Sequence, residues 1–374
     1  MRILIAGDLS LQDRANQVWK AEALQNAFSA VKAISKKCDH SIVNLESPVT
    51  GSNKPIIKDG PSLKNTAAVF DVIKYCGFDI ATLANNHLKD YGSQGVTDTI
   101  EKCKENGLLV VGAGPNLAEA RKALVLTDSV DGIKIGVINI CEHESSIALR
   151  TIAGANPLDF PYLYEDICKL KEQTDKIIVI IHGGREHYQL PTPRMKREYR
   201  MVVDMGADVV INHHQHCYSG YEIYNGSPIF YGLGNFFFDN PRKRDDKWNY
   251  GLMLELDINK DYTDFQLLPY EQCNNKTEIK VMPYEAVKEK VDELNSIIAD
   301  DIKLETSFDK LVMSEKLLYP FLPFSNRYYR FLYFKGLLPA FISKKNKALI
   351  ENAESCETHR EVLMSYFRII LNHE

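Results

Sequence analysis

The segment Val209-Val210-Ile211-Asn212-His213-His214-Gln215-His216 decides the fold class of this chain. Its first three residues are β-branched, as is typical of a buried strand, and polar residues follow at once. Three histidines within four positions are difficult to explain by packing alone. In open α/β sheets, ligands bind at the carboxyl ends of the strands. The segment therefore predicts a strand with a functional site at its carboxyl end.

Four other apolar runs end in polar residues in the same way. They occupy residues 3–8, 42–46, 80–87 and 177–182, and they end in Asp8, Glu46, Asn85-Asn86-His87 and His182. Helical patterns separate these runs as far as about Leu256, which indicates an α/β domain. Residues 221–231 and 251–256 alternate around an Asn225-Gly226 turn and predict antiparallel strands. We therefore expect a mixed sheet or a second sheet.

The composition is that of an ordinary globular protein. The 374 residues are 45% hydrophobic and 25% charged, and 45 Lys and Arg against 50 Asp and Glu give a formal net charge of -5. This balance provides no general basic field, so we expect no nucleic-acid partner. The eight scattered cysteines form no C-x-x-C motif and predict reduced, mostly buried thiols. The N-terminus enters a strand pattern without a signal-peptide pattern, so we expect a cytoplasmic location.

The composition changes after about Met282. We expect a catalytic domain over residues 1–282 and a mostly helical C-terminal appendage over residues 283–374. Residues 317–345 combine aromatic, apolar and basic side chains. This segment would either make peripheral contact with a membrane surface or form a helix packed on the catalytic domain.

The strand-end residues include a set of hard metal ligands. Carboxylate, amide and imidazole groups without thiolates suit one or two divalent ions such as Mn, Fe, Zn or Mg. Each motif alone is also consistent with a turn or a capped loop, but five of them together favour a metal centre. Cys217 would more simply pack in the core than act as a further ligand. The candidate ligands are Asp8, Glu46, Asn86, His182, His214 and His216.

The order of the motifs resembles that of the CapA-type proteins of bacterial capsule and poly-gamma-glutamate synthesis, whose domain is similar to calcineurin-type metallophosphoesterases. The resemblance covers roughly residues 1–238. The matching motifs are Gly7-Asp8, Asn44-Leu45-Glu46, Asn85-Asn86-His87 with Asp90 and Gly92, Gly112-Ala113-Gly114, His182-Gly183-Gly184-Arg185-Glu186, Gly206-Ala207-Asp208 before His214-Gln215-His216, and Gly232-Leu233-Gly234-Asn235-Phe236.

The resemblance implies a four-layer α/β/β/α sandwich with the site at one edge of both sheets. It implies that Asp8 and His216 hold one ion, that Asn86, His182 and His214 hold the other, and that Glu46 bridges them. His87 would contact the reacting phosphate or protonate the leaving group. Two features depart from the general phosphoesterase pattern: Asp8 is followed by Leu9-Ser10 rather than by x-His, and Glu46 replaces an aspartate.

The remaining candidate site residues would act around the ions. Asp90 would orient His87, Arg185 would bind an anionic substrate, Glu186 would orient a ligand or water, and Asn235 would reach the pocket rim. Arg185 and Glu186 are also consistent with a surface ion pair.

We therefore expect a metal-dependent hydrolase acting on a phosphoester or a related anionic small-molecule or polymer substrate in capsule, exopolysaccharide or poly-gamma-glutamate synthesis. Two alternatives stay open. One is a non-catalytic metal-binding subunit that supports polymer synthesis through partners or polymer, and the other is an amide hydrolase or transferase.

Overall fold

The computed structural model describes residues 1–18, 20–242, 245–314, 335 and 344–370. The strands are β1 (Arg2–Ser10), β2 (His40–Leu45), β3 (Ile80–Thr82), β4 (Leu109–Val111), β5 (Ala113–Gly114), β6 (Leu124–Thr127), β7 (Lys134–Cys141), β8 (Gly154–Ala155), β9 (Lys176–His182), β10 (Val209–His213), β11 (Tyr221–Tyr224), β12 (Ser227–Phe230), β13 (Asn235–Phe238), β14 (Tyr250–Ile258), β15 (Thr263–Gln272) and β16 (Ile279–Val281).

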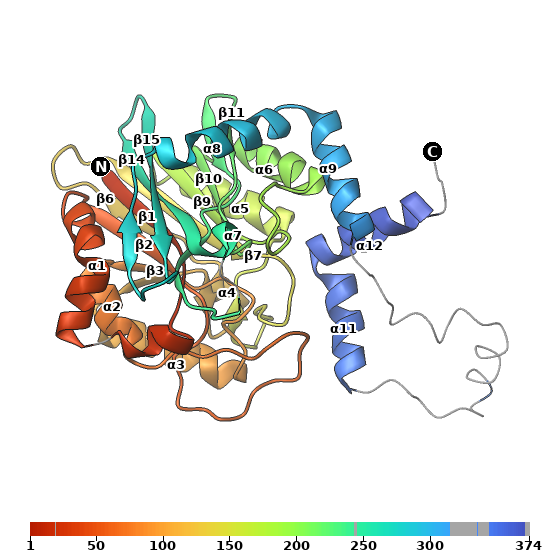
Figure 1. Cartoon of the computed structure of the whole chain (residues 1–374), viewed down its shortest axis with the longest axis horizontal. Helices are drawn as coiled ribbons and strands as arrows, with labels where there is room; N and C mark the ends of the chain where they lie inside the picture. Colours follow the sequence, from red (N-terminus) through yellow and green to blue (C-terminus); the bar gives the residue numbers. More distant parts are fainter. Residues whose placement is uncertain (19, 243–244, 315–334, 336–343, 371–374) are drawn as a thin grey trace.

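Helices connect these strands and continue beyond them (Figure 1). They are η1 (Asp13–Gln17), α1 (Ala21–Ser35), α2 (Val69–Cys76), α3 (Gly92–Glu105), α4 (Leu117–Ala120), α5 (Phe160–Lys171), α6 (Pro193–Met205), α7 (Asp246–Asn249), α8 (Glu285–Ile298), α9 (Asp301–Ser314), α11 (Lys344–Ser355) and α12 (Glu357–Ile370).

Two mixed sheets form the centre of the molecule. The first has the order β16-β15-β14-β1-β2-β3-β4, and β13 pairs with the far end of β1. The second has the order β11-β12-β10-β9-β7-β6. Strands β11 and β12 are antiparallel around a turn at Asn225 (φ 49°) and Gly226 (φ 86°), and β14 is antiparallel to β1. The expectation of a mixed or second sheet is confirmed.

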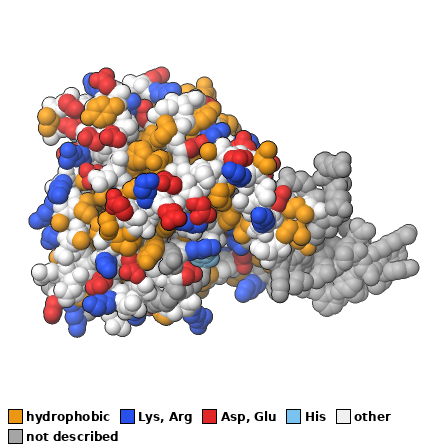
Figure 2. Space-filling model, turned by 45° about the horizontal axis from the view of Figure 1, so that its top comes forward, with side chains coloured by type: hydrophobic (Ala, Val, Ile, Leu, Met, Phe, Trp, Pro, Cys, Tyr) orange, Lys and Arg blue, Asp and Glu red, His pale blue; other side chains and the backbone are white. Residues whose placement is uncertain are grey.

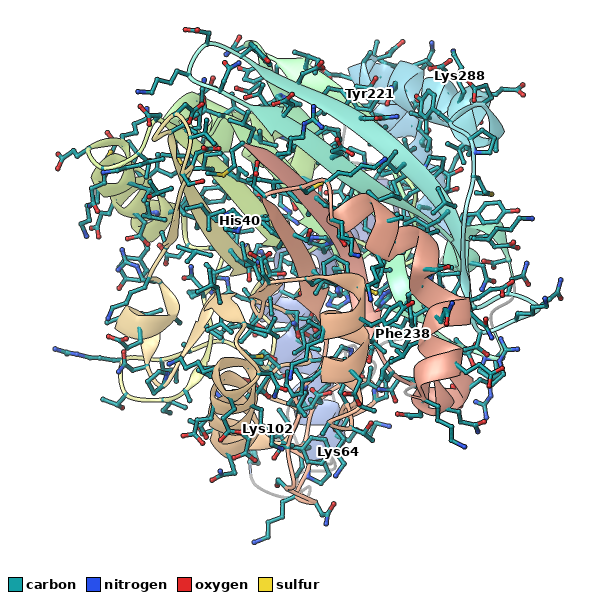
Figure 3. All side chains as sticks on the ribbon, turned by 90° about the vertical axis from the view of Figure 1, so that its left-hand side faces the viewer. His40, Lys64, Lys102, Tyr221, Phe238 and Lys288 are labelled. Atoms are coloured by element: carbon teal, nitrogen blue, oxygen red, sulfur yellow. The ribbon has the colours of Figure 1, made fainter. Side chains whose placement is uncertain are left out.

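Alternate residues of β1 face opposite layers. Ile3 and Ile5 belong to the core shared with the second sheet, whereas Leu4 and Ala6 belong to the core under α1 and α2. On the other side of the molecule, α5 packs against β9 and α6 against β10. The layers are therefore helix, sheet, sheet and helix, which confirms the four-layer sandwich. Figure 3 shows α1 across the outer face of the first sheet.

A close backbone approach shapes the site edge of this sandwich. A Cβ on Gly7 would lie 1.8 Å from the carbonyl oxygen of Gly234, so only glycine fits there. Gly234 itself has φ 77°. The same region contains register shifts in β1 around Asp8, which re-aim side chains at the strand end. The Gly7-Asp8 motif therefore lets β13 pair with β1 beside the site.

The described elements after residue 282 are helical, as expected. Helix α8 packs on the core of the second sheet, at the corner that Lys288 and Tyr221 mark in Figure 3. Helices α9 and α12 share a small core of Phe308, Val312 and Val362. The division at residue 282 stays a prediction.

The segment 317–345, expected to contact a membrane surface, lies outside the described residues except for Lys335, Lys344 and Lys345. Among the helices that the structure describes, none has the length and apolar character needed to cross a bilayer.

The state of the cysteines and the mixture of surface charges are those expected from the composition. All eight cysteines are free thiols, and six of them are buried, as expected. Acidic and basic side chains are interspersed over the face shown in Figure 2.

Candidate metal centre

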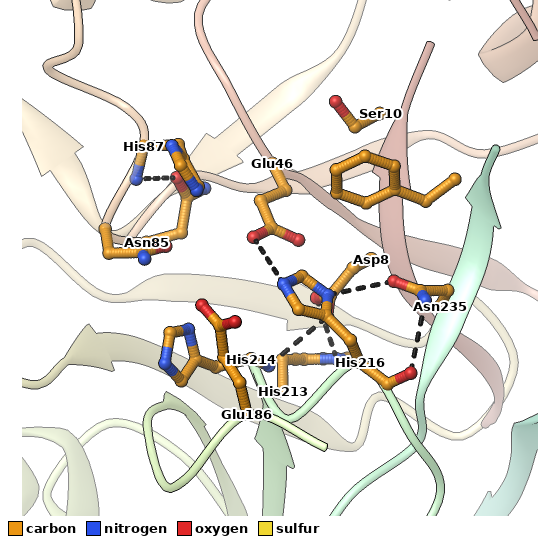
Figure 4. A network of polar contacts seen from close by, with 12 residues as sticks. Asp8, Ser10, Glu46, Asn85, His87, Glu186, His213, His214, His216 and Asn235 are labelled. Atoms are coloured by element: carbon orange, nitrogen blue, oxygen red, sulfur yellow. Dashed lines mark hydrogen bonds and ion pairs between the residues drawn. The ribbon is translucent and has the colours of Figure 1, made fainter. Parts of the chain in front are cut away.

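The six candidate ligands come together at one edge of the two sheets, and Figure 4 shows four of them, Asp8, Glu46, His214 and His216. Asp8 lies near the end of β1, Glu46 directly follows β2, and Asn86 follows β3. From the second sheet, His182 ends β9, and His214 and His216 follow β10. All six side chains are buried. Parallel strands that end at the same edge therefore place ligands from both sheets in one buried cluster.

Two groups of side chains in this cluster have the spacing of metal ligands. One consists of Asp8, Glu46 and His216, and the other of Glu46, His182 and His214. Within each group the ligand atoms lie within 4.8 Å of one another. Glu46 belongs to both groups, which is the arrangement that a bridging carboxylate requires.

The first group is held by hydrogen bonds from outside it. The Nδ1 atom of His216 lies 2.9 Å from Oδ1 of Asn235 and 3.5 Å from Oδ2 of Asp8. The Nε2 atom of the same ring faces Oε1 of Glu46 at 3.6 Å. Asp8 also accepts a 2.7 Å hydrogen bond from the Nδ2 atom of Asn44. Because Nδ1 faces the amide of Asn235, Nε2 is the atom of His216 that would be available to a metal ion.

In the second group, one nitrogen of His182 lies close to His214 and also to Asn86, the remaining candidate ligand. The Nε2 atom of His182 lies 3.1 Å from Oδ1 of Asn86 and 3.1 Å from Nδ1 of His214. Burial lowers the pKa of His182 well below its ordinary value and that of His214 to about 4. Both rings are therefore neutral at pH 7, the state in which imidazole binds metal.

Glu46 is the most exceptional side chain of the centre. It is completely buried, and neither carboxylate oxygen has a hydrogen-bond partner among the described residues. Burial raises its pKa well above the ordinary value. Burial alone would lower the pKa of His216, but the nearby Glu46 and Asp8 raise it to about 10. Glu46 and His216 thus form a buried pair that retains a proton.

The backbone around the ligands is locally strained. His214 (φ 92°), His216 (φ 56°) and Ser47 (φ 111°) all have positive φ angles, which non-glycine residues rarely adopt. Strain of this kind gathers at functional sites, where the surrounding structure fixes it. It turns the two histidines out of the line of β10 and towards the cluster.

His87 lies beside the ligands in a separate polar cluster. Its Nδ1 atom is 2.7 Å from Oδ2 of Asp90 and 3.2 Å from Nζ of Lys58. Lys58 also donates to Oδ1 of Asp90 at 2.5 Å. Burial and the Lys58 charge lower the pKa of His87. The expected contact between Asp90 and His87 is present, and Lys58 is an additional member that the sequence did not indicate.

The three residues expected to bind substrate occupy different settings. Arg185 and Glu186 are half-buried in the loop between β9 and α6, and Figure 4 shows Glu186 beside His214. Asn235 is fully buried, and besides its contact with His216 it donates to the backbone oxygens of His216 and Trp248. Asn235 therefore orients His216, a candidate ligand, and a substrate-binding role for all three residues stays a prediction.

Several residues near the centre were not expected to belong to it. Neither ring nitrogen of His213 has a hydrogen-bond partner in the described part of the chain, and its Nδ1 is 3.8 Å from Oδ1 of Asp8. Oε1 of Glu144 lies 4.0 Å from Nε2 of His214, and burial raises the pKa of Glu144 to about 8. The histidine run could have indicated His213, but no strand-end pattern marks Glu144.

The sequence of this chain is similar to a known protein family and to several known proteins. The family described as bacterial capsule synthesis protein PGA_cap matches residues 2–240. The PGA biosynthesis protein CapA of Bacillus subtilis (strain 168) is 32% identical over 237 residues, which cover 62% of each chain. The capsule biosynthesis protein CapA of Bacillus anthracis is 28% identical over 248 residues, covering 64% of this chain and 60% of that protein.

A more distant relative is a probable polyglutamine synthesis accessory protein of Mycobacterium tuberculosis (strain H37Rv). It is 30% identical over 169 residues, which cover 42% of this chain and 44% of that protein. The chain spans about 60% of the length of the two Bacillus proteins.

Among solved structures, a hypothetical protein from Thermus thermophilus aligns over 76% of this chain and all of its own length, with 14% identity and a TM-score of 0.47. The 5'-nucleotidase of Candida albicans aligns over 74% of this chain and 52% of its own, with 12% identity and a TM-score of 0.42. The fold assignment rests on the sheets and layers of this chain and not on these alignments.

Proposed function

Because this chain belongs to the bacterial capsule synthesis protein family PGA_cap, we propose that it is a metal-dependent hydrolase that serves the synthesis of a capsule, exopolysaccharide or poly-gamma-glutamate. Its substrate would be a phosphoester or a related anionic compound. The observation that carries this proposal is Glu46, a buried carboxylate that both ligand groups share and whose two oxygens have no hydrogen-bond partner in the described part of the chain.

The residues present fit one or two divalent ions. Buried polar atoms almost always have hydrogen-bond partners, so a carboxylate with none at either oxygen indicates a missing ligand. Asp8 and His216 would hold one ion, and His182, His214 and Asn86 the other, with Glu46 between them. Ions bound there would supply Lewis-acid chemistry towards a phosphoryl oxygen and water. The oxygen and imidazole donors suit Mn, Fe, Zn or Mg.

The protein's own groups would position the substrate and move a proton. His87 is held by Asp90 at Nδ1, so its Nε2 is the atom that would exchange a proton with the leaving group. Lys58 holds Asp90 in place and carries a positive charge next to the same ring. Arg185, in the loop after β9, would bind an anionic group of the substrate.

A second candidate is a metal-binding subunit without catalytic activity. A relative named as a polyglutamine synthesis accessory protein favours this reading. The names of the two Bacillus proteins, which refer to PGA and capsule biosynthesis, likewise keep amide hydrolysis or transfer as an alternative reaction.

Metal content is the first test of the proposal. The full chain would be equilibrated with Mn²⁺, Zn²⁺ or Mg²⁺, desalted and subjected to elemental analysis, followed by phosphate release from model phosphoesters. We expect one or two ions per chain in the wild type and their loss in Asp8→Asn and His214→Ala. His40→Ala, at the opposite end of β2, is the matched histidine control and should retain metal.

The two measurements separate the candidates. Retained metal with hydrolysis supports the hydrolase. Retained metal without hydrolysis of any phosphoester or amide would favour the binding subunit, and a protein that retains no ion would contradict the metal centre itself.

A further inference from the structure

A small cavity lies beside the metal centre, between the loop that follows β2 and helix α11. Its volume is about 210 Å³. Drug-sized ligands occupy pockets of about 300–1,000 Å³, so this one suits a smaller group, on the scale of a single sugar ring. The residues lining it are Ile56, Ile57, Lys58, Asp59, Glu144, Ser145, Ala348, Glu351, Asn352 and Ser355.

Two lining residues connect the cavity to the proposed reaction centre. Lys58 contacts His87 and Asp90 and lies 3.5 Å from the backbone oxygen of Asn86. Glu144 approaches His214 to 4.0 Å on the other side. The cavity therefore borders the centre next to His87, where the leaving group of a substrate would be.

Helix α11 is one wall of the cavity, and α12 holds that wall in place. Glu357 at the start of α12 accepts a hydrogen bond from the backbone N of His143 (2.8 Å) and contacts its Nδ1 (2.6 Å). Thr358 donates to Oε1 of Glu142 at 2.7 Å.

A second anchor lies on α6, where the partly buried Arg194 forms ion pairs with Glu142 and with Glu361 of α12. Both α11 and α12 lie beyond residues 2–240, so this wall is a feature outside the part of the chain that the family shares.

The lining has the chemistry of a site for hydroxyl groups. Carboxylates, amides and hydroxyls (Glu144, Asn352, Ser145 and Ser355) can accept or donate hydrogen bonds, while Ile56 and Ala348 offer apolar surface to a carbon ring. Asp59 and Glu351 also line the cavity, and its lysine is already paired with Asp90, so a polyanion such as a glutamate chain is disfavoured.

We propose that this cavity is the leaving-group subsite and that it takes a neutral, hydroxyl-bearing group the size of one sugar, so that the substrate is a sugar phosphate monoester. This inference rests on the proposed phosphoesterase function. In the reaction, water adds its oxygen to phosphorus as the bond from phosphorus to the sugar oxygen breaks. The sugar oxygen gains a proton, and inorganic phosphate and the free sugar are released.

The test fills the cavity from the α11 side. Ala348→Trp places a large ring in it, and Glu354→Trp places the same ring on an exposed position of the same helix outside it. Phosphate release from glucose 6-phosphate and glucose 1-phosphate would be measured with the metal-loaded full chain. Acetyl phosphate, whose acetate leaving group needs little of the cavity, is the reference substrate.

We expect Ala348→Trp to lower kcat/KM for the sugar phosphates by about tenfold or more, mainly through KM, and to leave acetyl phosphate nearly unchanged. Glu354→Trp should change neither. Equal metal content and melting temperature in both variants would show that the fold is intact.

The outcomes separate this inference from the proposed function. A wild type that hydrolyses acetyl phosphate but no sugar phosphate overturns the sugar subsite and leaves the phosphoesterase intact. Unchanged sugar-phosphate kinetics in a folded Ala348→Trp protein also overturn the subsite. If the metal-loaded wild type hydrolyses neither kind of substrate, the phosphoesterase function itself fails.

Discussion

Replacing Glu46 by glutamine should have opposite effects on stability in the two states of the protein. It should stabilise the metal-free protein or leave it unchanged, and it should make the metal-loaded protein less stable than the metal-loaded wild type. Without metal, the carboxylate is buried, neither oxygen has a hydrogen-bond partner among the described residues, and the nitrogen of His216 that faces it is 3.6 Å away. An unsatisfied buried polar group costs about 1–3 kcal/mol, and more when it is charged. The glutamine side chain would remove the charge and keep the shape. We therefore expect metal-free Glu46→Gln to be as stable as the metal-free wild type or up to about 3 kcal/mol more stable.

With metal bound, the wild type should be more stable than Glu46→Gln. An ion that binds only the folded state stabilises it by about 2.7 kcal/mol at a hundred times its Kd. For a domain of this size each kcal/mol moves Tm by about 2–4 °C, so the wild type should gain roughly 5–11 °C. Glu46→Gln lacks the bridging charge and should gain little.

The assay is thermal unfolding in EDTA and in Mn²⁺, with Glu105→Gln on the exposed face of α3 as the matched control. The control should follow the wild type in both conditions. The reasoning is refuted if Glu46→Gln loses several degrees in EDTA, or if Mn²⁺ raises its Tm as much as that of the wild type.

Three further changes test the surroundings of the centre. Asn235→Ala removes the amide that orients a histidine ligand, so the protein should stay folded while its metal affinity, measured by competition with a chelating dye, falls about 10–100-fold. Gly7→Ala would bring a Cβ 1.8 Å from a backbone oxygen and should cost about 1–3 kcal/mol or more in urea unfolding. The pKa of His143 is raised by its hydrogen bond to Glu357, so that contact stabilises α12 fully below about pH 6.5 and is lost as pH rises through the raised value. Proteolysis of α12 should therefore increase as pH rises above about 6.5, and this pH dependence should disappear in Glu357→Gln.

The convergence of the candidate ligands was predictable because parallel strands end at a common edge. Each of the candidates Asp8, Glu46 and His182 ends or directly follows an apolar run, so a pattern along the chain corresponds to a position in space. The alternation of apolar residues likewise indicates which faces are buried. These signals are local, and the fold follows from them once the strands pair.

The surroundings of the ligands could not be predicted in the same way. Lys58 lies in a long loop without a periodic pattern, and its contact with Asp90 joins residues 32 positions apart. Asn235 has the sequence context of a loop that reaches a pocket, but its amide turns inward to His216. The spacing of residues along the chain does not predict the contacts of Lys58 or of Asn235. Both depend on which loops meet when the two sheets pack together.

The charges of the centre couple metal binding to proton release. Burial alone would raise the pKa of Asp8, but the hydrogen bond to His216 and the positive charge of that ring outweigh burial and hold this pKa below its ordinary range. The pair of Glu46 and His216 keeps a proton at pH 7, since the pKa of His216 is about 10. A divalent ion needs both Glu46 as carboxylate and His216 as neutral imidazole, so its binding must displace that proton. Affinity should therefore rise with pH, and metal stabilisation measured at low pH would underestimate the centre. The same buried charge that makes Glu46 unfavourable without an ion would make it a strong ligand with one.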